Sequence, residues 1–234
     1  MFKRLMKPIK INRGERSMTK KIKALLFDFD GTLLDTNELI IQSFQHVLEK
    51  HYPGRYSREE ILPFLGPTLT EIFTLVDPDR IEQFTTEYRA WNIANHDALS
   101  SEFDGVSETI RLLKNEGFKM AIVSTKINYM VQKGLDLLDV EGVFDVVIGY
   151  DDVSKTKPDP EPILLALERL GVEPEEAIMI GDNYHDIVGG QNAGVRTAGV
   201  AWTAKGEDFL QKYHPDYMLQ HISDLIPIVK GEKD

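Results

Sequence analysis

The sequence predicts an α/β protein in which a doubly wound parallel sheet carries a small helical domain inserted after its first strand. Short apolar runs alternate with stretches whose apolar residues recur at helical spacing, which is the pattern of parallel strands joined by helices. The interval between the first two runs, residues 37–101, is far longer than one connecting helix requires. We therefore expect regular crossovers to build the sheet and the long interval to hold a second, smaller unit.

Five apolar runs are the expected strands. The first covers residues 22–29, contains neither Gly nor Pro, and is typical of a strand buried on both faces. The other four cover residues 119–124, 144–148, 177–180 and 196–200. Expected connecting helices cover residues 106–116, 129–138 and 160–170, and Gly117 and Gly171 stand where helix C-terminal caps belong.

The inserted interval has helical patterns of its own. Residues 39–50 are amphipathic, Ser57 followed by Glu60 resembles a capping box, and residues 81–95 form another helical run rich in aromatic side chains. We expect residues 37–101 to form a helical cap and residues 18–36 and 102–234 to form the core. Residues 1–17 are basic and aperiodic, which favours a disordered extension before Met18, with a targeting arm or membrane-surface anchor as the alternative.

Composition excludes several kinds of chemistry. The 234 residues include no cysteine, so thiol nucleophiles, disulfides and thiolate metal sites are excluded. A formal net charge of -11 disfavours nucleic acid and anionic membranes as partners, and an anionic substrate would need a local cation. No apolar run approaches the roughly 18 residues of a membrane span, and the N-terminus lacks the apolar region of a secretory signal. We therefore expect a cytoplasmic protein.

Polar side chains follow four of the expected strands, at the edge of the sheet where α/β proteins bind ligands. They are Asp28 and Asp30 after the first strand, Ser124 and Thr125 after the second, Lys157 after the third, and Asp182 and Asp186 after the fourth. We expect these side chains to converge on one crevice.

The pair Asp28 and Asp30 indicates a cation site. Residues two apart in an extended segment point the same way, so both carboxylates would face one pocket with Phe29 in the core. Close carboxylates repel one another unless one is protonated or a cation lies between them, and Asp182 adds a third acid. Mg²⁺, which prefers oxygen ligands, is the expected ion, while Gly31 permits a tight turn. The alternative is an Asx turn that merely ends the strand.

The other candidates are weaker alone. Ser124 offers a hydroxyl and Thr125 a backbone N–H for an oxyanion, although a serine at a strand end is usually only a helix cap. Lys157 lies in a proline-stiffened loop that could aim its ammonium, with Lys155 as the competing choice and a solvated surface lysine as the alternative to both.

The segment around Asp182 joins a strand to a helix. Asp186 could cap that helix, pair with Lys157 or support the metal from outside its ligand shell. His185 is expected to face solvent. Three glycines follow the helix start, at residues 189, 190 and 194, and favour close packing of the helix over phosphate binding.

Taken together, these motifs resemble the four motifs of the haloacid dehalogenase superfamily in order and spacing. The matching segments are Asp28-Phe29-Asp30-Gly31-Thr32, Ser124, Lys157 before Pro158-Asp159-Pro160, and Gly181-Asp182 with Asp186. The resemblance spans residues 21 to about 227. It implies a Rossmann-like core with a C1-type helical cap inserted after the first strand.

The resemblance also implies roles for the residues. Asp28 would be the nucleophile and form an aspartyl-phosphate, and Asp30 would be the general acid and then the general base. Asp30 argues against true dehalogenation, because the dehalogenating branch lacks that second acid and the metal. Phosphoryl oxygens would be held by Ser124, the Thr125 amide and Lys157, and Mg²⁺ by Asp28, the Asp30 carbonyl and Asp182.

A finer resemblance concerns the substrate. The segments 37–41, 62–67, 157–162 and 185–194 are similar to a branch of inorganic pyrophosphatases from Bacillus-like bacteria. A phosphoglycolate or sugar-phosphate phosphatase, or a β-phosphoglucomutase-like mutase, is the alternative, and a receiver-type signalling module or a silent interaction domain fits poorly. Specificity is expected from the cap loop with Phe64 and Gly66, and from Arg58 or Arg89. We expect a monomer that acts on a small phosphorylated substrate.

Overall fold

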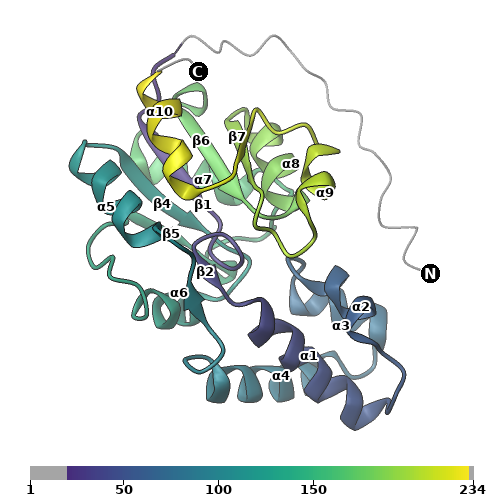
Figure 1. Ribbon diagram of the computed structural model, residues 1–234. Coiled ribbons are helices and arrows are strands. Elements are labelled where there is room, and N and C mark those ends of the chain that lie inside the picture. The colour runs from purple at the N-terminus through teal and green to yellow at the C-terminus, as the bar shows by residue number, and fades with distance from the viewer. Residues whose placement is uncertain (1–19, 232–234) are drawn as a thin grey trace.

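The computed structural model describes residues 20–231, so the expectations for residues 1–17 lie outside the described part of the chain. A six-stranded sheet lies between helices on both faces, and a group of helices lies beyond one end of its strands (Figure 1). The strand order is β5-β4-β1-β6-β7-β8, and every neighbouring pair is parallel. The doubly wound fold class predicted from the sequence is confirmed.

The strands are short and buried. Their bounds are β1 Ala24–Phe27, β4 Lys119–Val123, β5 Val146–Ile148, β6 Ala177–Gly181, β7 Arg196–Val200 and β8 Tyr217–Leu219. Successive side chains of β1 alternate between the two faces, so that Leu25 and Phe27 enter one hydrophobic cluster while Ala24 and Leu26 enter the other. Both faces of the central strand are therefore covered, as its continuous apolar sequence predicts.

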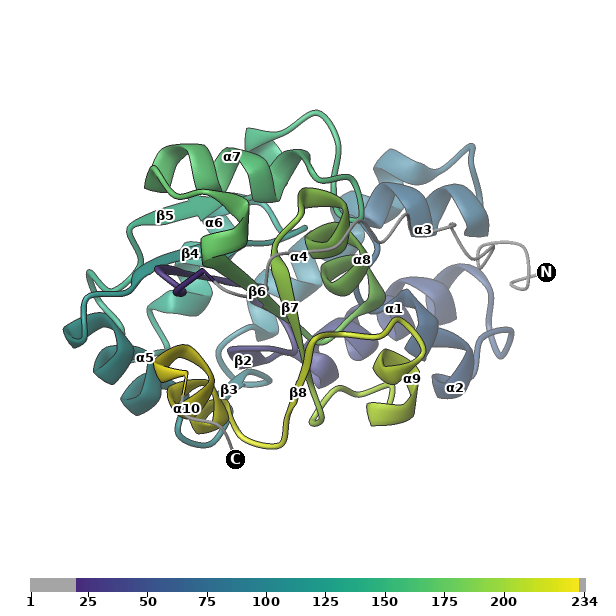
Figure 2. The same cartoon turned by 90° about the horizontal axis from the view of Figure 1, so that it is seen from above.

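Two layers of helices cover the sheet. On one face lie α5 (Val106–Asn115), α6 (Asn128–Leu135) and α10 (Leu225–Lys230), and on the other α7 (Glu161–Leu170) and α8 (Tyr184–Ala193) (Figure 2). Helix α9 (Glu207–Gln211) follows β7. Gly171 ends α7 in the left-handed conformation, at a φ of 62°, as its position in the sequence predicts.

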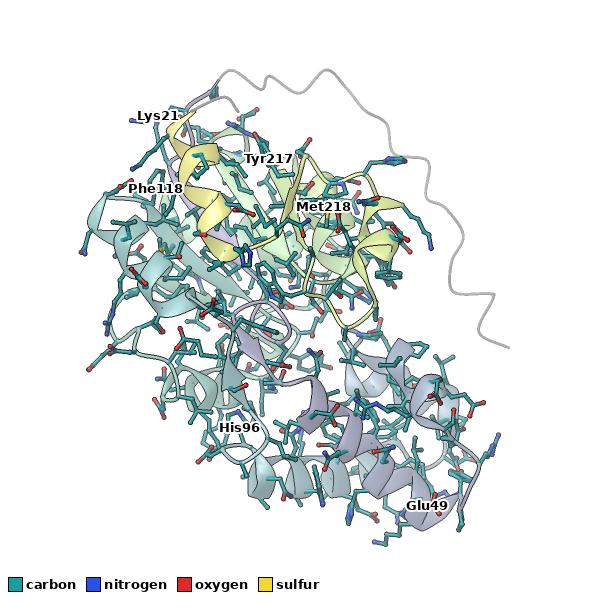
Figure 3. All side chains as sticks on the ribbon, viewed as in Figure 1. Lys21, Glu49, His96, Phe118, Tyr217 and Met218 are labelled. Carbon is teal, nitrogen blue, oxygen red and sulfur yellow. The ribbon has the colours of Figure 1, made fainter. Side chains whose placement is uncertain are left out.

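The cap contains four helices: α1 Asn37–His51, α2 Arg58–Ile61, α3 Leu69–Val76 and α4 Ile81–Asn95. They enclose a separate hydrophobic cluster that is rich in aromatic rings, with Phe44 in contact with Phe64, Phe73 and Tyr88. Glu49 lies at the end of the cap far from the sheet, whereas His96 lies where the chain returns toward it (Figure 3). The expected capping box of Ser57 and Glu60 is present.

Short elements were missed by the sequence patterns. A two-stranded ribbon of β2 (Leu34–Asp35) and β3 (Ser101–Glu102) lies where the chain enters and leaves the cap. These strands and β8 have only two or three residues each, which is too short for a period to be visible. Helix α3 was also missed. Among residues 20–231, no helix has the length and apolarity that crossing a membrane requires.

Candidate active site

The predicted site residues converge at the carboxyl ends of the parallel strands. Asp28 follows β1, Ser124 follows β4, and Asp182 follows β6 directly, so these residues share one edge of the sheet. Lys157 reaches this edge from the loop between β5 and α7. This is the edge where open α/β sheets bind their ligands.

Lys157 lies at the centre of a buried ion-pair network. Its Nζ donates to Asp28 Oδ1 at 2.8 Å, to Asp186 Oδ1 at 2.6 Å and to the Val123 carbonyl at 2.6 Å. Burial alone would lower the pKa of Lys157, but the charges of Asp186 and Asp28 outweigh it and raise the pKa above its usual value. Lys155, by contrast, has a side chain that is 68% exposed. Lys157 is thus the lysine that the loop aims at the site.

Three buried carboxylates meet beside this lysine. Asp28, Asp182 and Asp186 each offer an oxygen, and the three oxygens lie within 4.8 Å of one another. Burial, with the nearby Asp186 charge, raises the pKa of Asp28 to about 7 even though Lys157 opposes the shift. Burial, with the charges of Asp186 and Asp28, raises the pKa of Asp182 well above its usual range. The site therefore holds more negative charge than one ammonium offsets.

A divalent cation fits this donor set. Within residues 20–231 no group donates a hydrogen bond to the Asp182 carboxylate, which leaves both its oxygens available as ligands. A Cβ at Gly31 would lie 2.6 Å from Asp182 Oδ2, so only glycine, here at a φ of 76°, leaves room for that carboxylate. Converging carboxylate oxygens of this kind suit Mg²⁺ rather than a soft metal.

Asp186 has two of the roles left open by the sequence. Besides pairing with Lys157, it accepts a hydrogen bond from the Asn183 backbone at 3.0 Å and so completes the capping box that begins α8. His185 is only 3% exposed, so the expectation that it faces solvent is wrong. Burial lowers its pKa to about 3 and keeps the ring neutral. Gly190 packs against Thr197, as expected for glycines that bring α8 close to the sheet.

Asp30 is held by two donors. Its Oδ1 accepts from Thr36 Oγ1 at 2.6 Å and from Lys126 Nζ at 2.6 Å. Asp28 and Asp30 both line one cavity while Phe29 is fully buried, as the alternation predicts. Lys126 was missed by the sequence analysis, although its place two residues after Ser124 at the same strand end could have revealed it.

Ser124 and Thr125 leave the sheet together. Ser124 is buried, and its hydroxyl accepts a hydrogen bond from the Lys126 backbone at 3.1 Å. Thr125 Oγ1 donates to the Gly66 carbonyl of the cap at 3.2 Å. The Thr125 side chain therefore also helps to attach the cap.

The cap loop closes over the core. The Leu65 carbonyl accepts from Asn183 Nδ2 at 2.9 Å and from Lys205 Nζ at 2.7 Å. A Cβ at Gly66 would lie 2.2 Å from Asn183 Nδ2, and the φ of 102° also requires glycine. Lys205 and Asn183 were not expected as cap contacts, because no local pattern connects them with residues 65 and 66.

A cavity of about 180 Å³ lies between the core and the cap. Its lining includes Asp28, Asp30, Asp182, Thr125, Lys126, Phe64, Gly66 and Arg89. Arg58 instead forms an ion pair with Glu38 on the cap surface and is absent from this lining. Of the two arginines considered for specificity, Arg89 is the one that reaches the cavity.

Comparison with known proteins agrees with this arrangement. Residues 25–200 match the haloacid dehalogenase-like hydrolase family, and the chain belongs to that family. It is therefore a hydrolase with the fold that the motifs imply.

Individual relatives indicate which kind of hydrolase the chain is similar to. The chain is 52% identical over 211 residues to Pyrophosphatase PpaX of Bacillus cereus strain B4264, covering 90% of this chain and 98% of the relative. It is 53% identical over 211 residues to the protein of the same name from Bacillus pumilus strain SAFR-032, with the same coverage. A solved haloacid dehalogenase-like hydrolase structure from Bacteroides fragilis superposes with a TM-score of 0.82 at 33% identity, covering 88% of this chain and 100% of that chain. The predicted resemblance to a pyrophosphatase branch is confirmed.

Proposed function

We propose that this protein hydrolyses inorganic pyrophosphate to two orthophosphates, with Mg²⁺ as cofactor and an aspartyl-phosphate on Asp28 as intermediate. The observation that carries the proposal is the Lys157–Asp28 contact of 2.8 Å beside a cavity of about 180 Å³ that Asp28 lines. This volume is below the roughly 300–1,000 Å³ of pockets for drug-sized ligands, so a small anion suits it. The Bacillus relatives named pyrophosphatase support the choice of anion.

The first half-reaction forms the intermediate. Lys157 holds Asp28 Oδ1, which leaves the second carboxylate oxygen to attack one phosphorus atom of the substrate. A bond forms from that oxygen to phosphorus, and the bond from phosphorus to the bridging oxygen breaks. The bridging oxygen departs with the electron pair as part of orthophosphate and takes a proton from Asp30.

The second half-reaction restores the enzyme. Asp30, now a carboxylate, takes a proton from a water molecule whose oxygen attacks the phosphorus of the aspartyl-phosphate. The bond between phosphorus and the Asp28 oxygen breaks, the carboxylate is regenerated and the second orthophosphate leaves. Thr36 and Lys126 orient Asp30 for both proton transfers, since both donate to the same oxygen.

The remaining residues bind rather than react. The Ser124 hydroxyl, the Thr125 backbone N–H and the Lys157 ammonium would hold the phosphoryl oxygens. Mg²⁺ would be held by Asp28, the Asp30 carbonyl and Asp182, and when bound it would supply positive charge that stabilises the phosphoryl oxygens. Asp186 supports this arrangement by fixing Lys157.

The core and the cap have different roles in this proposal. The described parts of residues 18–36 and 102–234 form the core that carries the chemistry, and residues 37–101 form the cap. Gly66 brings the cap against the core through its contact with Thr125, and Phe64 lines the cavity from the cap side. We place the enzyme in the cytoplasm as a monomer.

A substrate panel tests the proposal. Phosphate release is measured with Mg²⁺ on pyrophosphate, phosphoglycolate and hexose phosphates at equal enzyme concentration. We expect kcat/KM for pyrophosphate to exceed the others by at least about 10-fold, which corresponds to about 1.4 kcal/mol. A higher value for phosphoglycolate, or interconversion of hexose phosphates without phosphate release, would favour the phosphatase or mutase alternative.

A further inference from the structure

Lys126 is a partly buried cation that lines the cavity beside the reacting groups. Its side chain is 13% exposed and lines the cavity together with Asp28, Asp30 and Asp182. Within residues 20–231, its ammonium has one hydrogen-bond acceptor, Asp30 Oδ1 at 2.6 Å. A lysine ammonium carries three N–H donors, so two remain for a ligand.

Lys157 differs from Lys126 in this respect. All three of its donors are used, on Asp28, Asp186 and the Val123 carbonyl. It is therefore committed to the nucleophile and its surroundings, reaches the transferred phosphoryl group only by exchanging one of these acceptors, and has no N–H donor left for a second anionic group. A second anionic group on the same substrate needs another cation.

The cavity offers few candidates for that second cation. Among the described residues that line it, the cationic side chains are Lys126 and Arg89, and much of the remaining wall is apolar. Arg89 lies on the cap helix α4 and is largely exposed, so water screens its charge. The Lys126 side chain is much less exposed, at 13%, and its ammonium contacts Asp30, the residue that would protonate the leaving oxygen.

We propose that Lys126 binds the departing phosphate of pyrophosphate and so makes the enzyme selective for substrates with an anionic leaving group. This inference rests on the proposed function and assigns the leaving-group side of the same site. When the bond between phosphorus and the bridging oxygen breaks, the electron pair becomes charge on the departing orthophosphate. Lys126 donates hydrogen bonds to that oxyanion and keeps its own protons, so the proton balance of the reaction is unchanged.

The position of Lys126 fits this role. Asp30 must lie next to the bridging oxygen to protonate it, and the Lys126 ammonium lies 2.6 Å from Asp30 Oδ1. The Lys126 backbone N–H donates to the Ser124 hydroxyl at 3.1 Å, which fixes the base of the side chain on the rigid end of β4. A sugar alcohol as leaving group would not need this charge, whereas a phosphate carries it throughout the reaction.

Two substrates with different leaving-group charge separate this role from a merely structural one. Pyrophosphate loses a phosphate, and p-nitrophenyl phosphate loses a phenolate that has no phosphate group. Lys126→Met is compared with the wild-type enzyme and with Lys155→Met, a control that removes an exposed lysine outside the cavity. We expect Lys126→Met to lower kcat/KM for pyrophosphate about 10- to 100-fold more than kcat/KM for p-nitrophenyl phosphate, because the loss of the contact with Asp30 affects both substrates, whereas only pyrophosphate loses charge-assisted hydrogen bonds to its leaving group.

Binding gives a second readout that does not need turnover. By calorimetry with Mg²⁺, we expect Lys126→Met to bind methylenediphosphonate, a non-hydrolysable pyrophosphate analogue, at least about 10-fold more weakly than Lys155→Met does. Lys126→Arg keeps the charge and should restore part of the affinity, and Lys126→Gln, which also removes the charge, replaces Lys126→Met if that variant does not fold. Equal losses on both substrates, or unchanged analogue binding, would overturn the role of Lys126. A wild-type enzyme that is inactive on pyrophosphate but active on p-nitrophenyl phosphate would instead overturn the proposed function.

Discussion

Replacing Lys157 with methionine tests the buried ion-pair network. The side chain is 2% exposed, so water cannot take the place of the lost ammonium. Methionine fills much of the volume but leaves Asp28, Asp186 and the Val123 carbonyl without their shared donor. Removing one partner of a buried ion pair costs about 3–5 kcal/mol, because the remaining charge stays buried.

This cost predicts a measurable loss of thermal stability. At about 2–4 °C per kcal/mol for a chain of this size, Lys157→Met should lower Tm by about 6–20 °C at pH 8. Lys157 also lowers the pKa of Asp28, which burial raises to about 7. In Lys157→Met the pKa of Asp28 rises further. The wild-type Asp28 carboxyl loses its proton between pH 6 and pH 8, so the stability lost by Lys157→Met relative to the wild type should grow over this range.

Thermal unfolding in a chelating buffer measures the loss without a contribution from bound metal. Lys155→Met is the matched control, since its side chain is 68% exposed and its removal should change the free energy of unfolding by less than about 0.5 kcal/mol. Phosphate release by Lys157→Met should fall at least about 100-fold. A Lys157→Met protein as stable as this control would refute the account of the network.

Three further perturbations test other parts of the structure. Chelation of divalent metal should abolish phosphate release, and added Mg²⁺ should restore it; a rate that a strong chelator leaves unchanged would exclude the metal site. Gly66→Ala should raise KM and weaken cap closure, since a Cβ would lie 2.2 Å from Asn183 Nδ2; steady-state kinetics with an unchanged KM would contradict the cap contact. Glu87→Gln should destabilise the protein by about 1 kcal/mol at pH 7, because hydrogen bonds from His51 and Lys50 outweigh burial and lower the pKa of Glu87 from 4.5 to about 2. The folded-state pKa of Glu87 lies below its unfolded value, so its contribution to the free energy of unfolding is complete above pH 4.5 and is lost toward pH 2. Urea titrations should therefore show that the difference in free energy of unfolding between the wild type and Glu87→Gln shrinks from pH 4.5 to pH 2.

Much of the core could be predicted because its signals are local. Strand β6 was predicted to within one residue, since a buried strand reads as one apolar run. Asp28, Asp30 and Asp182 could be placed together because parallel strands present their carboxyl ends at one edge. The strand β8 was missed because its three residues are too few to show a period.

Other features depend on segments that are distant in the chain. Nothing local separates Lys155 from Lys157, and only the fold shows that one is exposed and the other lies between two aspartates. His185 was expected to face solvent rather than to bind a ligand, yet the fold buries it. The contact of Lys205 with the cap joins residues 140 positions apart, and no sequence period reports such a pairing.

Orthophosphate release from pyrophosphate with Mg²⁺, compared between the wild-type and Asp28→Asn enzymes, shows whether Asp28 is the nucleophile. Asparagine preserves the shape of the side chain, so folding should persist while the nucleophile is lost. We predict rapid release by the wild-type enzyme and a rate at least about 10³-fold lower for Asp28→Asn, with unchanged circular dichroism. Equal rates for the two proteins would contradict Asp28 as the nucleophile.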